Sequence, residues 1–396
     1  MRILHILTFH QPAGIENRVF RFIRTAGGHE HAVLVVSRRI HENFKANLPS
    51  STAVRHWKYW GRFKIPAFLR KFFLKNWLKK NRFDLFMSYS QLSYPGLWDT
   101  LFENVNAPGV YWEEGAAWSK SKELKELIGR FDAYAAVSEA SAVMLQKKFG
   151  VPGDKIKVIH NGIPEEKFSS LKEAAPAEKN RDRFIILYLG RLVPFKGVES
   201  LIRSLKFMEP DCELWIIGDG EEKGRLQELA RETGVENRVQ FKGMLVDPDP
   251  YLKGADLMVV PSIREPFGIV LLEAGAASLA VIASRVDGIP DIISHRKNGI
   301  LIEPGIEIDR AHMKGLPELT VRVETRELIP PRILRPEDIA GAVNELKNNP
   351  SLRKRLGENL YNTVRKNFRM EDKILEFEKF SETLAPLRKT GDTEEG

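Results

Sequence analysis

The stretch that decides the fold is Val260–Asp291, VPSIREPFGIVLLEAGAASLAVIASRVDGIPD. It overlaps an apolar run, ADLMVVP at 255–261, which is typical of a buried strand that ends at a proline. A loop, REPFG, comes next, and the residues from Ile269 onward are apolar on nearly all sides, which predicts a helix buried between layers. A buried strand, a loop and a buried helix in this order favour an α/β fold with a parallel sheet.

Two acids in this stretch point to a ligand. Glu273 lies within the apolar helix, where a carboxylate without a partner is costly, so we expect it to have a definite partner. Glu265 lies eight residues earlier, in the loop. We expect the two acids to flank a hydroxylated ligand across the helix N-terminus, with the amides of Phe267, Gly268 and Ile269 binding its oxygens. This arrangement suits a nucleotide sugar.

A second motif, GRLVPFKG at 190–197, follows the apolar strand FIILYL at 184–189. Arg191 and Lys196 are five residues apart in a loop that begins at Gly190 and ends in glycine, so both cations can reach one diphosphate. A purely structural explanation needs a separate acid for each cation. We therefore interpret this loop as a diphosphate-binding loop.

The segment EPFGIVLLE at 265–273, followed by AVIAS at 280–284 and DGIPDII at 287–293, resembles the signature of retaining GT-B glycosyltransferases of family 4, the glycosyl transferases group 1. The E-x7-E spacing is weak evidence alone, but the flanking segments make the match specific. The resemblance implies two Rossmann-like domains that face each other across a cleft. It also implies that Arg191 and Lys196 stabilise the leaving diphosphate of a nucleotide-sugar donor, that Glu265 contacts the donor sugar, and that Glu273 holds the ribose.

The resemblance assigns further residues to the donor. The turn after LWII at 214–217 contains Gly218 and Gly220, and the turn after VQFKG at 239–243 begins with Met244 and Leu245; both turns line the base pocket in the family. The family also closes a Gly-Gly pair of the first loop over the diphosphate, and only Gly14 remains of that pair here.

Two acids, Glu113 and Glu114, stand at the end of a predicted strand where many relatives have a histidine. Either acid orients an acceptor hydroxyl, or the pair belongs to a solvated acidic loop. His160, in a strand-ending His-Asn-Gly turn, is interpreted only as a neighbour of the hinge.

Length and composition limit the class of protein. With 396 residues, 43% of them hydrophobic, the chain can form two domains with large cores. The single cysteine, Cys212, excludes a disulfide framework or a cysteine-based zinc site and fits a reducing cytoplasm. No apolar run approaches the roughly 20 residues of a membrane span. We expect a cytoplasmic protein, either soluble or peripheral on the inner face of the cytoplasmic membrane.

We expect no cofactor and no metal ion. Asp247-Pro248-Asp249 has the D-x-D form that holds a metal in the other glycosyltransferase fold, but it lies away from the diphosphate motifs. In this interpretation Arg191 and Lys196 take the place of a metal cation.

The expected domain organisation has five parts. They are an N-terminal acceptor-binding domain at 1–165, a linker at 166–182, a C-terminal nucleotide-sugar domain at 183–369, a helix at 370–388 that crosses back to the first domain, and a disordered tail at 389–396. The second domain contains an insertion at 306–335, in which Leu319–Glu327 alternates like a hairpin strand. No role is assigned to this insertion.

The stretch from Arg62 to Phe83 carries eight Lys or Arg and no acid, interleaved with aromatic residues. The charge of this stretch alone equals the net charge of the whole chain, +8. We expect a helix packed on a sheet, whose basic side binds an anionic leaflet or a lipid-linked acceptor. The chain has no recognised nucleic-acid module, so nucleic acid is not an expected partner. The patch favours a glycan or lipid-linked acceptor in lipopolysaccharide, capsule or exopolysaccharide synthesis.

Three alternatives stay open at this point. A sucrose- or glucan-type glycosyltransferase would use a soluble acceptor. An enzyme like the UDP-sugar 2-epimerases shares the GT-B fold but should lack the paired E-x7-E and G-R-x4-K-G motifs. A scaffold without catalytic activity would not need both charge pairs.

Overall fold

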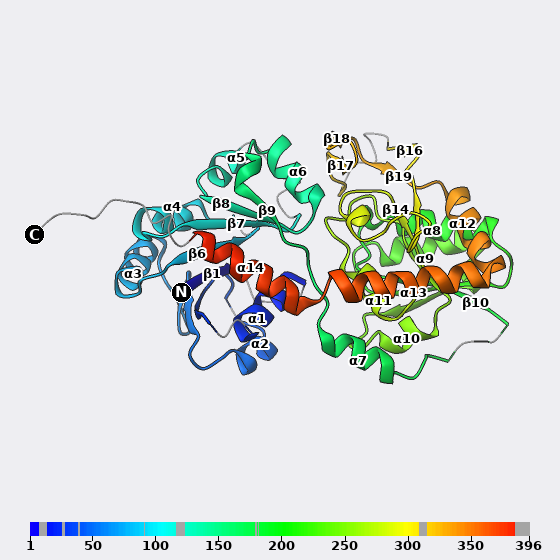
Figure 1. The fold of residues 1–396 in the computed structure, drawn as a ribbon, viewed down its shortest axis with the longest axis horizontal. Helices are drawn as coiled ribbons and strands as arrows, with labels where there is room; N and C mark the ends of the chain where they lie inside the picture. The colour runs from blue at the N-terminus through cyan, green and yellow to red at the C-terminus, as the bar shows by residue number, and fades with distance from the viewer. Residues whose placement is uncertain are drawn as a thin grey trace, which may run out of the picture. The chain divides into compact units, whose positions relative to one another are not determined.

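The structure, a computed structural model, describes residues 1–7, 14–25, 28–38, 40–90, 92–115, 123–178, 180, 182–308 and 315–384. The chain divides into two compact units (Figure 1). Unit 1 comprises residues 1–137, 144–159 and the chain from 373, and unit 2 comprises residues 138–143 and 160–372.

Unit 1 is built on a seven-stranded parallel sheet in the order β3-β2-β1-β6-β7-β8-β9. Its strands are β1 Arg2–Leu7, β2 Glu30–Val35, β3 Ala53–His56, β6 Leu85–Tyr89, β7 Gly109–Glu113, β8 Ala133–Ala136 and β9 Ile156–Val158. Its helices are α1 Gly14–Thr25, α2 Glu42–Asn47, α3 Ala67–Lys80, α4 Pro95–Asn104, α5 Glu123–Ile128, α6 Glu139–Lys147, which the division between the units cuts, and α14 Met370–Leu384. Strands β6 and β7 are fully buried, and so is β1 apart from Arg2, as expected for a sheet covered on both faces.

The last helix, α14, belongs to unit 1 from Lys373 onward, although it follows unit 2 in sequence. Its Phe377 is 2% exposed and packs against two rings of unit 1, with centroid distances of 4.6 Å to Phe22 and 5.1 Å to Trp112. The helix ends at Leu384 in the described chain, and the predicted tail at 389–396 lies outside the described residues.

Unit 2 is built on a six-stranded parallel sheet in the order β12-β11-β10-β13-β14-β15. Its strands are β10 Phe184–Leu189, β11 Cys212–Ile217, β12 Val239–Gly243, β13 Leu257–Val260, β14 Val281–Ser284 and β15 Ile300–Ile302. Its helices are α7 Glu165–Glu173, α8 Val198–Ser204, α9 Lys223–Glu232, α10 Asp249–Gly254, α11 Ile269–Ala276, α12 Pro336–Asn348 and α13 Pro350–Asn367. Two parallel sheets of this kind confirm the predicted α/β class.

The strand order explains why the two sequence motifs meet. The order reverses between β10 and β13, which pair directly through Ile186 with Leu257 and Leu187 with Met258. The carboxyl ends of these neighbouring strands lead into the loops at 190–197 and 261–268. Open α/β sheets bind ligands at such a reversal, because the chain leaves its two sides in opposite directions.

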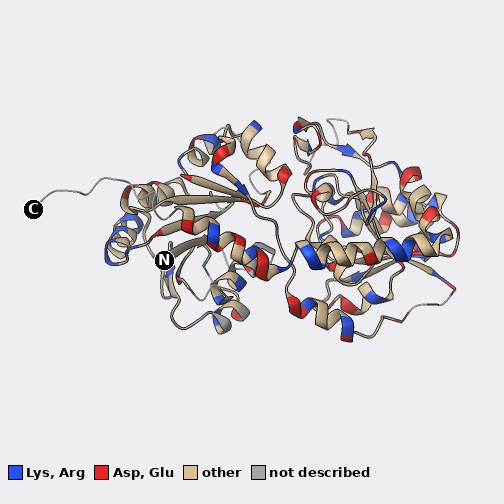
Figure 2. Cartoon of the chain, in the orientation of Figure 1, with Lys and Arg blue, Asp and Glu red and all other residues tan. Residues whose placement is uncertain are grey.

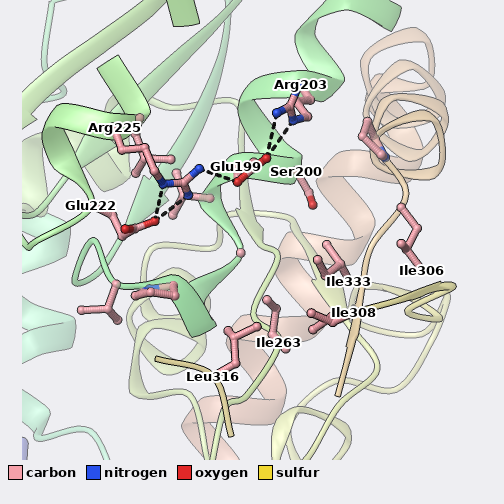
Figure 3. Close-up of a pocket in the computed structure, with 16 residues that line it drawn as sticks. Glu199, Ser200, Arg203, Glu222, Arg225, Ile263, Ile306, Ile308, Leu316 and Ile333 are labelled. Carbon is pink, nitrogen blue, oxygen red and sulfur yellow. Dashed lines mark hydrogen bonds and ion pairs between the residues drawn. The ribbon is translucent and has the colours of Figure 1, made fainter. Parts of the chain in front are cut away.

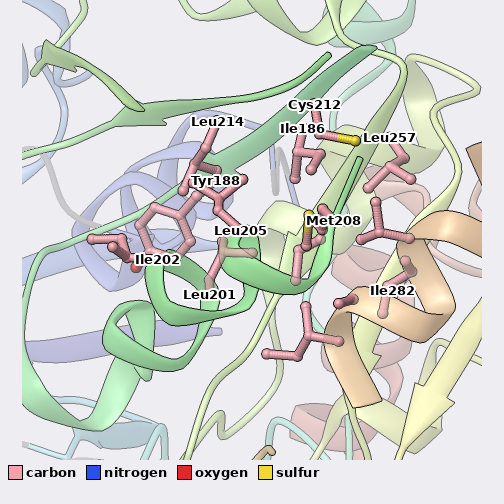
Figure 4. Close-up of a cluster of buried hydrophobic side chains, with 14 of the residues drawn as sticks. Ile186, Tyr188, Leu201, Ile202, Leu205, Met208, Cys212, Leu214, Leu257 and Ile282 are labelled. Carbon is pink, nitrogen blue, oxygen red and sulfur yellow. The ribbon is translucent and has the colours of Figure 1, made fainter. Parts of the chain in front are cut away.

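One core cluster of unit 2 lies on one face of its sheet, beneath α8, α9 and α12 (Figure 4). Alternate residues of β10, namely Phe184, Ile186 and Tyr188, point into this cluster, as the two-residue period of a strand requires. Cys212 is buried in the same cluster.

The predicted linker at 166–182 is wrong in its first half, because residues 165–173 form helix α7. Phe168 and Leu171, three residues apart, are buried on one side of this helix, and the Phe168 ring packs edge-on to Tyr361 at 5.8 Å. Lys167 pairs with Asp249 of α10, and Ser170 donates a hydrogen bond of 2.6 Å to the same carboxylate. The burial of one short apolar face, which the charged composition concealed, holds this segment as a helix.

The insertion at 306–335 forms two small antiparallel pairs. Strand β16 Ile306–Glu307 pairs with β19 Arg332–Ile333, and β17 Thr320–Arg322 pairs with β18 Glu327–Ile329. A hairpin is present as predicted, but the single strand expected over Leu319–Glu327 is wrong in extent: only Thr320–Arg322 is a strand, residues 323–326 form the turn, and Glu327 begins the second strand. Residues 309–314 of the insertion lie outside the described chain. The β17–β18 pair is called the hairpin below.

The basic stretch begins with a short antiparallel strand pair, β4 Tyr59–Trp60 with β5 Phe63–Lys64, and continues into helix α3. Helix α3 buries only Leu74 and Leu78. Across the described residues, none of the helices has the length and apolar character needed to span a membrane.

Candidate active site

The two loops of unit 2 are joined backbone to backbone. The carbonyl oxygen of Phe195 accepts hydrogen bonds from the amides of Ile263 at 2.9 Å and Arg264 at 3.2 Å. Gly197 has a φ of 66°, and a Cβ at this position would lie 2.1 Å from the carbonyl oxygen of Pro261. The approach of the two loops therefore requires glycine after Lys196.

Lys196 and Glu265, from the two loops, form an ion pair. Their Nζ and Oε2 atoms are 2.5 Å apart, and their side chains are only 17% and 9% exposed. The Ser262 hydroxyl donates a second hydrogen bond to Oε2 at 3.3 Å. The structure thus brings two of the sequence-predicted residues into contact. Glu265 is the acidic partner of Lys196, which the sequence motif alone did not identify.

Arg191 lies beside this pair and is exposed. Its carbonyl oxygen accepts a hydrogen bond of 2.9 Å from the Tyr188 hydroxyl, and its guanidinium lies 5.9 Å from the centre of the Phe195 ring. Within the described chain, its guanidinium has no acidic partner. Burial and the charge of Glu265 raise the pKa of Tyr188, so this hydroxyl stays a neutral donor.

A third cation, which sequence reasoning missed, completes this surface. The Arg264 guanidinium lies 5.1 Å from the centre of the Phe195 ring, and Lys196 Nζ lies 6.0 Å from the same point. Arg264 is adjacent to Glu265 in sequence, which was the available signal. Three cations and one carboxylate leave a net positive charge near the end of β10, which favours an anionic ligand.

The start of α11 provides backbone donors rather than polar side chains. Phe267 is 2% exposed because its ring stacks on His160 at 5.6 Å and packs edge-on to Phe368 at 5.9 Å. Gly268, with a φ of 99°, is the N-cap residue. In the part of the chain that the structure describes, the amides of Phe267, Gly268 and Ile269 donate no hydrogen bonds. These amides can bind ligand oxygens.

Glu273 lies in the second turn of α11 and is partly buried. Burial raises the pKa of its carboxyl, while the charge of Lys167 opposes this shift and that of Asp249 adds to it. Its carboxylate makes no hydrogen bond to any described residue. The definite partner that a carboxylate needs here is therefore not supplied by the described chain, which leaves the position open to hydroxyl groups of a ligand.

The glycines of the next turn pack against backbone. Gly218 has a φ of 136°, and a Cβ there would lie 1.9 Å from the carbonyl oxygen of Gly190; a Cβ at Gly220 would lie 2.2 Å from that of Leu192. Each turn thus requires glycine for its contact with the neighbouring turn, whether or not a ligand is bound. The predicted base-pocket residue Met244 is 76% exposed.

The remaining predicted positions fall differently. Gly14 is the first residue of α1, and the loop at 8–13 that precedes it lies outside the described residues. Leu245 is partly exposed beside Met244.

The interpretation of Glu113 as a solvated acid is wrong. Glu113 is fully buried, and its carboxylate accepts hydrogen bonds from the Tyr111 hydroxyl at 2.7 Å and the Gly115 amide at 2.5 Å.

Two other acids have protein partners. Asp249, part of the rejected D-x-D motif, is occupied by Lys167 and Ser170. Asp291 accepts a hydrogen bond of 3.1 Å from Nε2 of His160, whose ring stacks on Phe267. His160 therefore supports the start of α11.

A cavity of about 460 Å³ lies behind the two loops (Figure 3). Ile263 and Gly197 contribute to its wall, together with Ile306, Leu316 and Ile333 of the insertion and a charged network at one end. Its lining does not include Arg191, Lys196 or Glu265, so this cavity is separate from the charged cluster.

Solved structures with the same arrangement define the class of fold. HepE of Anabaena in complex with UDP superposes with a TM-score of 0.74 at 19% identity, covering 97% of this chain and 100% of that one. Two parallel α/β units of this kind make up the GT-B fold.

Sequence comparisons match two family models. Residues 170–314 match the model for glycosyl transferases group 1, and residues 12–167 match that for glycosyltransferase family 4. Both models describe glycosyltransferases, and together they cover most of the chain.

Individual relatives match over part of their length. An uncharacterized glycosyltransferase of Methanocaldococcus jannaschii is 40% identical over 213 residues, which cover 50% of this chain and 53% of that protein. The lipopolysaccharide core biosynthesis glycosyltransferase LpsD of Rhizobium meliloti is 29% identical over 187 residues, 47% of this chain and 46% of its own. The chain thus spans about half the length of the curated relatives that it matches.

Proposed function

We propose that this protein is a retaining glycosyltransferase that transfers a sugar from a nucleotide-diphosphate sugar to a glycan or lipid-linked acceptor. The observation that carries the proposal is the meeting of Arg191, Lys196 and Glu265 with the free amides of α11 at one edge of the unit 2 sheet. In this proposal the two cations bind the diphosphate, Glu265 contacts the donor sugar, and Glu273 holds the ribose hydroxyls.

The proposed chemistry is electrostatic. When the bond between the anomeric carbon and the phosphate oxygen breaks, negative charge grows on the departing diphosphate, next to Arg191 and Lys196. Removing one preorganised donor of this kind typically costs about 3 to 4 kcal/mol of transition-state stabilisation. The cations supply the counter-charge without a metal ion, and Lys196 stays oriented by Glu265 before the donor binds.

A panel of UDP-, GDP- and ADP-sugars with an acceptor extract, read by released nucleotide, tests the proposal. UDP-sugars are the first choice, because the Anabaena relative was solved with UDP and with UDP-glucose. Arg191→Ala and Lys196→Ala should each lower kcat/KM by about 100- to 1000-fold. Lys354→Ala, which removes an exposed cation of α13, is the control and should leave it unchanged. The roles proposed for the two cations are wrong if both loop variants stay within twofold of wild type.

The proposed stereochemistry rests on the resemblance to the retaining family, which suggests front-face displacement with the departing phosphate as base. Glu265 is held by Lys196 and is not placed as the nucleophile of a two-step reaction, so we propose that the product keeps the anomeric configuration of the donor by this route. Proton NMR of the product linkage checks this outcome. An inverted linkage contradicts it.

The acceptor is proposed to be membrane-associated, because α3 of unit 1 carries a run of Lys and Arg (Figure 2) next to exposed aromatic side chains. Lys71, Lys75 and Lys79 recur every four residues along α3 and are all exposed. Exposed aromatic side chains accompany them: Trp60 is 60%, Phe63 82%, Phe68 81% and Phe72 58% exposed. Large rings left in solvent beside cations fit an anionic lipid surface, which takes up both groups.

Two sets of variants separate charge from ring insertion in vesicle sedimentation. Changing Lys71, Lys75, Lys79 and Lys80 to Gln removes about 1 kcal/mol of attraction per cation and should abolish binding to anionic vesicles at low salt. Arg70 is kept, because its Nε donates a hydrogen bond to the Ile65 carbonyl.

The second set of variants replaces exposed aromatic residues and leaves every charged residue in place. Phe63→Ser with Phe68→Ser should weaken binding at low and high salt alike, whereas Phe207→Ser, which changes an exposed ring of unit 2, should not. Donor hydrolysis should stay intact in all these variants. If the wild-type protein does not bind anionic vesicles at low salt, the acceptor is soluble.

A further inference from the structure

One carboxylate in unit 2, that of Asp287, joins two segments that are distant in sequence. Its Oδ2 accepts a hydrogen bond of 2.9 Å from the amide of Glu265, and its Oδ1 accepts one of 2.7 Å from the amide of Val321. The Asp287 amide in turn donates to the Val321 carbonyl oxygen at 3.1 Å. Asp287 therefore links the loop of the candidate site to the hairpin in the insertion.

The geometry at Asp287 is demanding. The residue is fully buried, and its φ of 48° is in the left-handed region, which side chains other than those of glycine, asparagine and aspartate rarely adopt. A glycine would relieve the backbone and keep the backbone bonds, but it would lose both carboxylate bonds. The backbone conformation alone therefore favours glycine. An aspartate at this position adds the two hydrogen bonds that its carboxylate accepts from the amides of Glu265 and Val321.

Hydrogen bonds fix the backbone of Glu265 at both its amide and its carbonyl group. Its amide donates to Asp287, and its carbonyl oxygen accepts a hydrogen bond of 3.0 Å from the Gly288 amide. Its carboxylate meets Lys196 from this anchored backbone. A shift of the anchor would carry the carboxylate away from both Lys196 and the sugar.

The hairpin is fixed at the same point. Thr320 and Val321 are each 1% exposed, whereas Glu324, at the turn, is an exposed residue paired with Arg285 at 2.9 Å. The buried end of the hairpin is thus the end that contacts Asp287.

We propose that Asp287 is a positioning residue that holds Glu265 in place against the hairpin, so that the hairpin, residues 320–329, is a working part of the donor site. This inference rests on the role proposed above for Glu265. It assigns a role to the hairpin, to which the sequence alone assigned none.

The ionisation of Asp287 gives the linkage a pH dependence. Burial raises the pKa of this carboxyl to about 7, although the two amide donors and the charge of Arg264 lower it; the charge of Glu265 raises it further. The ionised form accepts from both amides, whereas the protonated form holds them less well. Sugar transfer should therefore increase as the pH rises through about 7.

The test uses the full-length protein with Asp287→Asn and Asp287→Gly. The second variant suits the left-handed backbone, so it keeps the test valid if the first does not fold. We expect kcat for sugar transfer to fall by about 10- to 100-fold, since small misplacements of a positioning group have effects of this size. The affinity for UDP alone, which lacks the sugar, should stay within twofold of wild type, and the inflection of the pH profile near 7 should be absent. Glu324→Gln, at the turn of the hairpin, is the matched control and should behave as wild type.

Amide hydrogen exchange provides a readout independent of turnover. Peptides that contain Val321 and Glu265 should both lose protection in the Asp287 variants, and neither should in Glu324→Gln. Wild-type kcat in a folded Asp287 variant would overturn the inference, as would a loss of protection confined to one of the two peptides. If the wild-type protein transfers no sugar from any donor, the proposed function fails, and the exchange result alone decides whether the linkage exists.

Discussion

Replacing Lys196 with methionine should destabilise unit 2, because it leaves the carboxylate of Glu265 without its counter-ion in a site that is 9% exposed. At a separation of 2.5 Å and an effective dielectric constant of about 20, Coulomb's law gives an attraction of about 6 to 7 kcal/mol before desolvation is counted. Removing one partner of a buried pair is typically destabilising by about 3 to 5 kcal/mol. We expect about 3 kcal/mol here, since Lys196 keeps some contact with solvent.

A double-mutant cycle isolates the pair. Glu265→Gln should cost about 2 kcal/mol, and the double variant with Lys196→Met about 2 kcal/mol as well, so the coupling between the two side chains is about 3 kcal/mol. Hydrogen exchange of the β10 and β13 amides measures the free energy of unfolding of unit 2 separately from unit 1. A coupling below about 0.5 kcal/mol would refute the reasoning, because Arg264 would then hold the Glu265 carboxylate equally well.

Three further predictions concern stability and reactivity. Gly218→Ala should cost more than about 2 kcal/mol in thermal or urea unfolding, because its Cβ would meet a backbone oxygen at 1.9 Å, whereas Gly224→Ala, in α9 with open space around it, should be neutral or stabilising by up to about 1 kcal/mol. Phe168→Ala should cost about 3 to 5 kcal/mol and expose α7 to protease, unlike a change in a true linker. Burial raises the pKa of the Cys212 thiol to about 11, so only about one thiol in a thousand is ionised at pH 8, and the native protein should resist a thiol reagent that labels it rapidly in urea.

The sequence predicted the strands and the glycine-bounded loops of unit 2 because each buried strand is a continuous apolar run that ends at a turn residue. Ala255–Pro261 and Phe184–Leu189 are of this kind, and they became β13 and β10. Helix α7 was missed because a helix that buries only Phe168 and Leu171 resembles a charged linker in composition.

The candidate site was predictable at the level of residue types but not of partners. Charge, spacing and the family resemblance together identified Arg191, Lys196 and Glu265, yet the direct pairing of Lys196 with Glu265 depends on the strand order, which places β10 beside β13. The linkage through Asp287 was missed because Val321 contributes only its backbone amide and carbonyl groups, and backbone groups leave no signal in a sequence.

The position of α14 has a consequence for biosynthesis. Phe22 and Trp112 emerge early from the ribosome, but Phe377, which covers them, follows the whole of unit 2. At translation rates of about 5 to 20 residues per second, the interval between residue 160 and the end of α14 at residue 384 is about 10 to 45 s. During that time the sheet of unit 1 is complete, but its apolar surface near Phe22 and Trp112 is uncovered. The nascent chain is therefore a substrate for chaperones that bind exposed aromatic surfaces until its last helix has been synthesised.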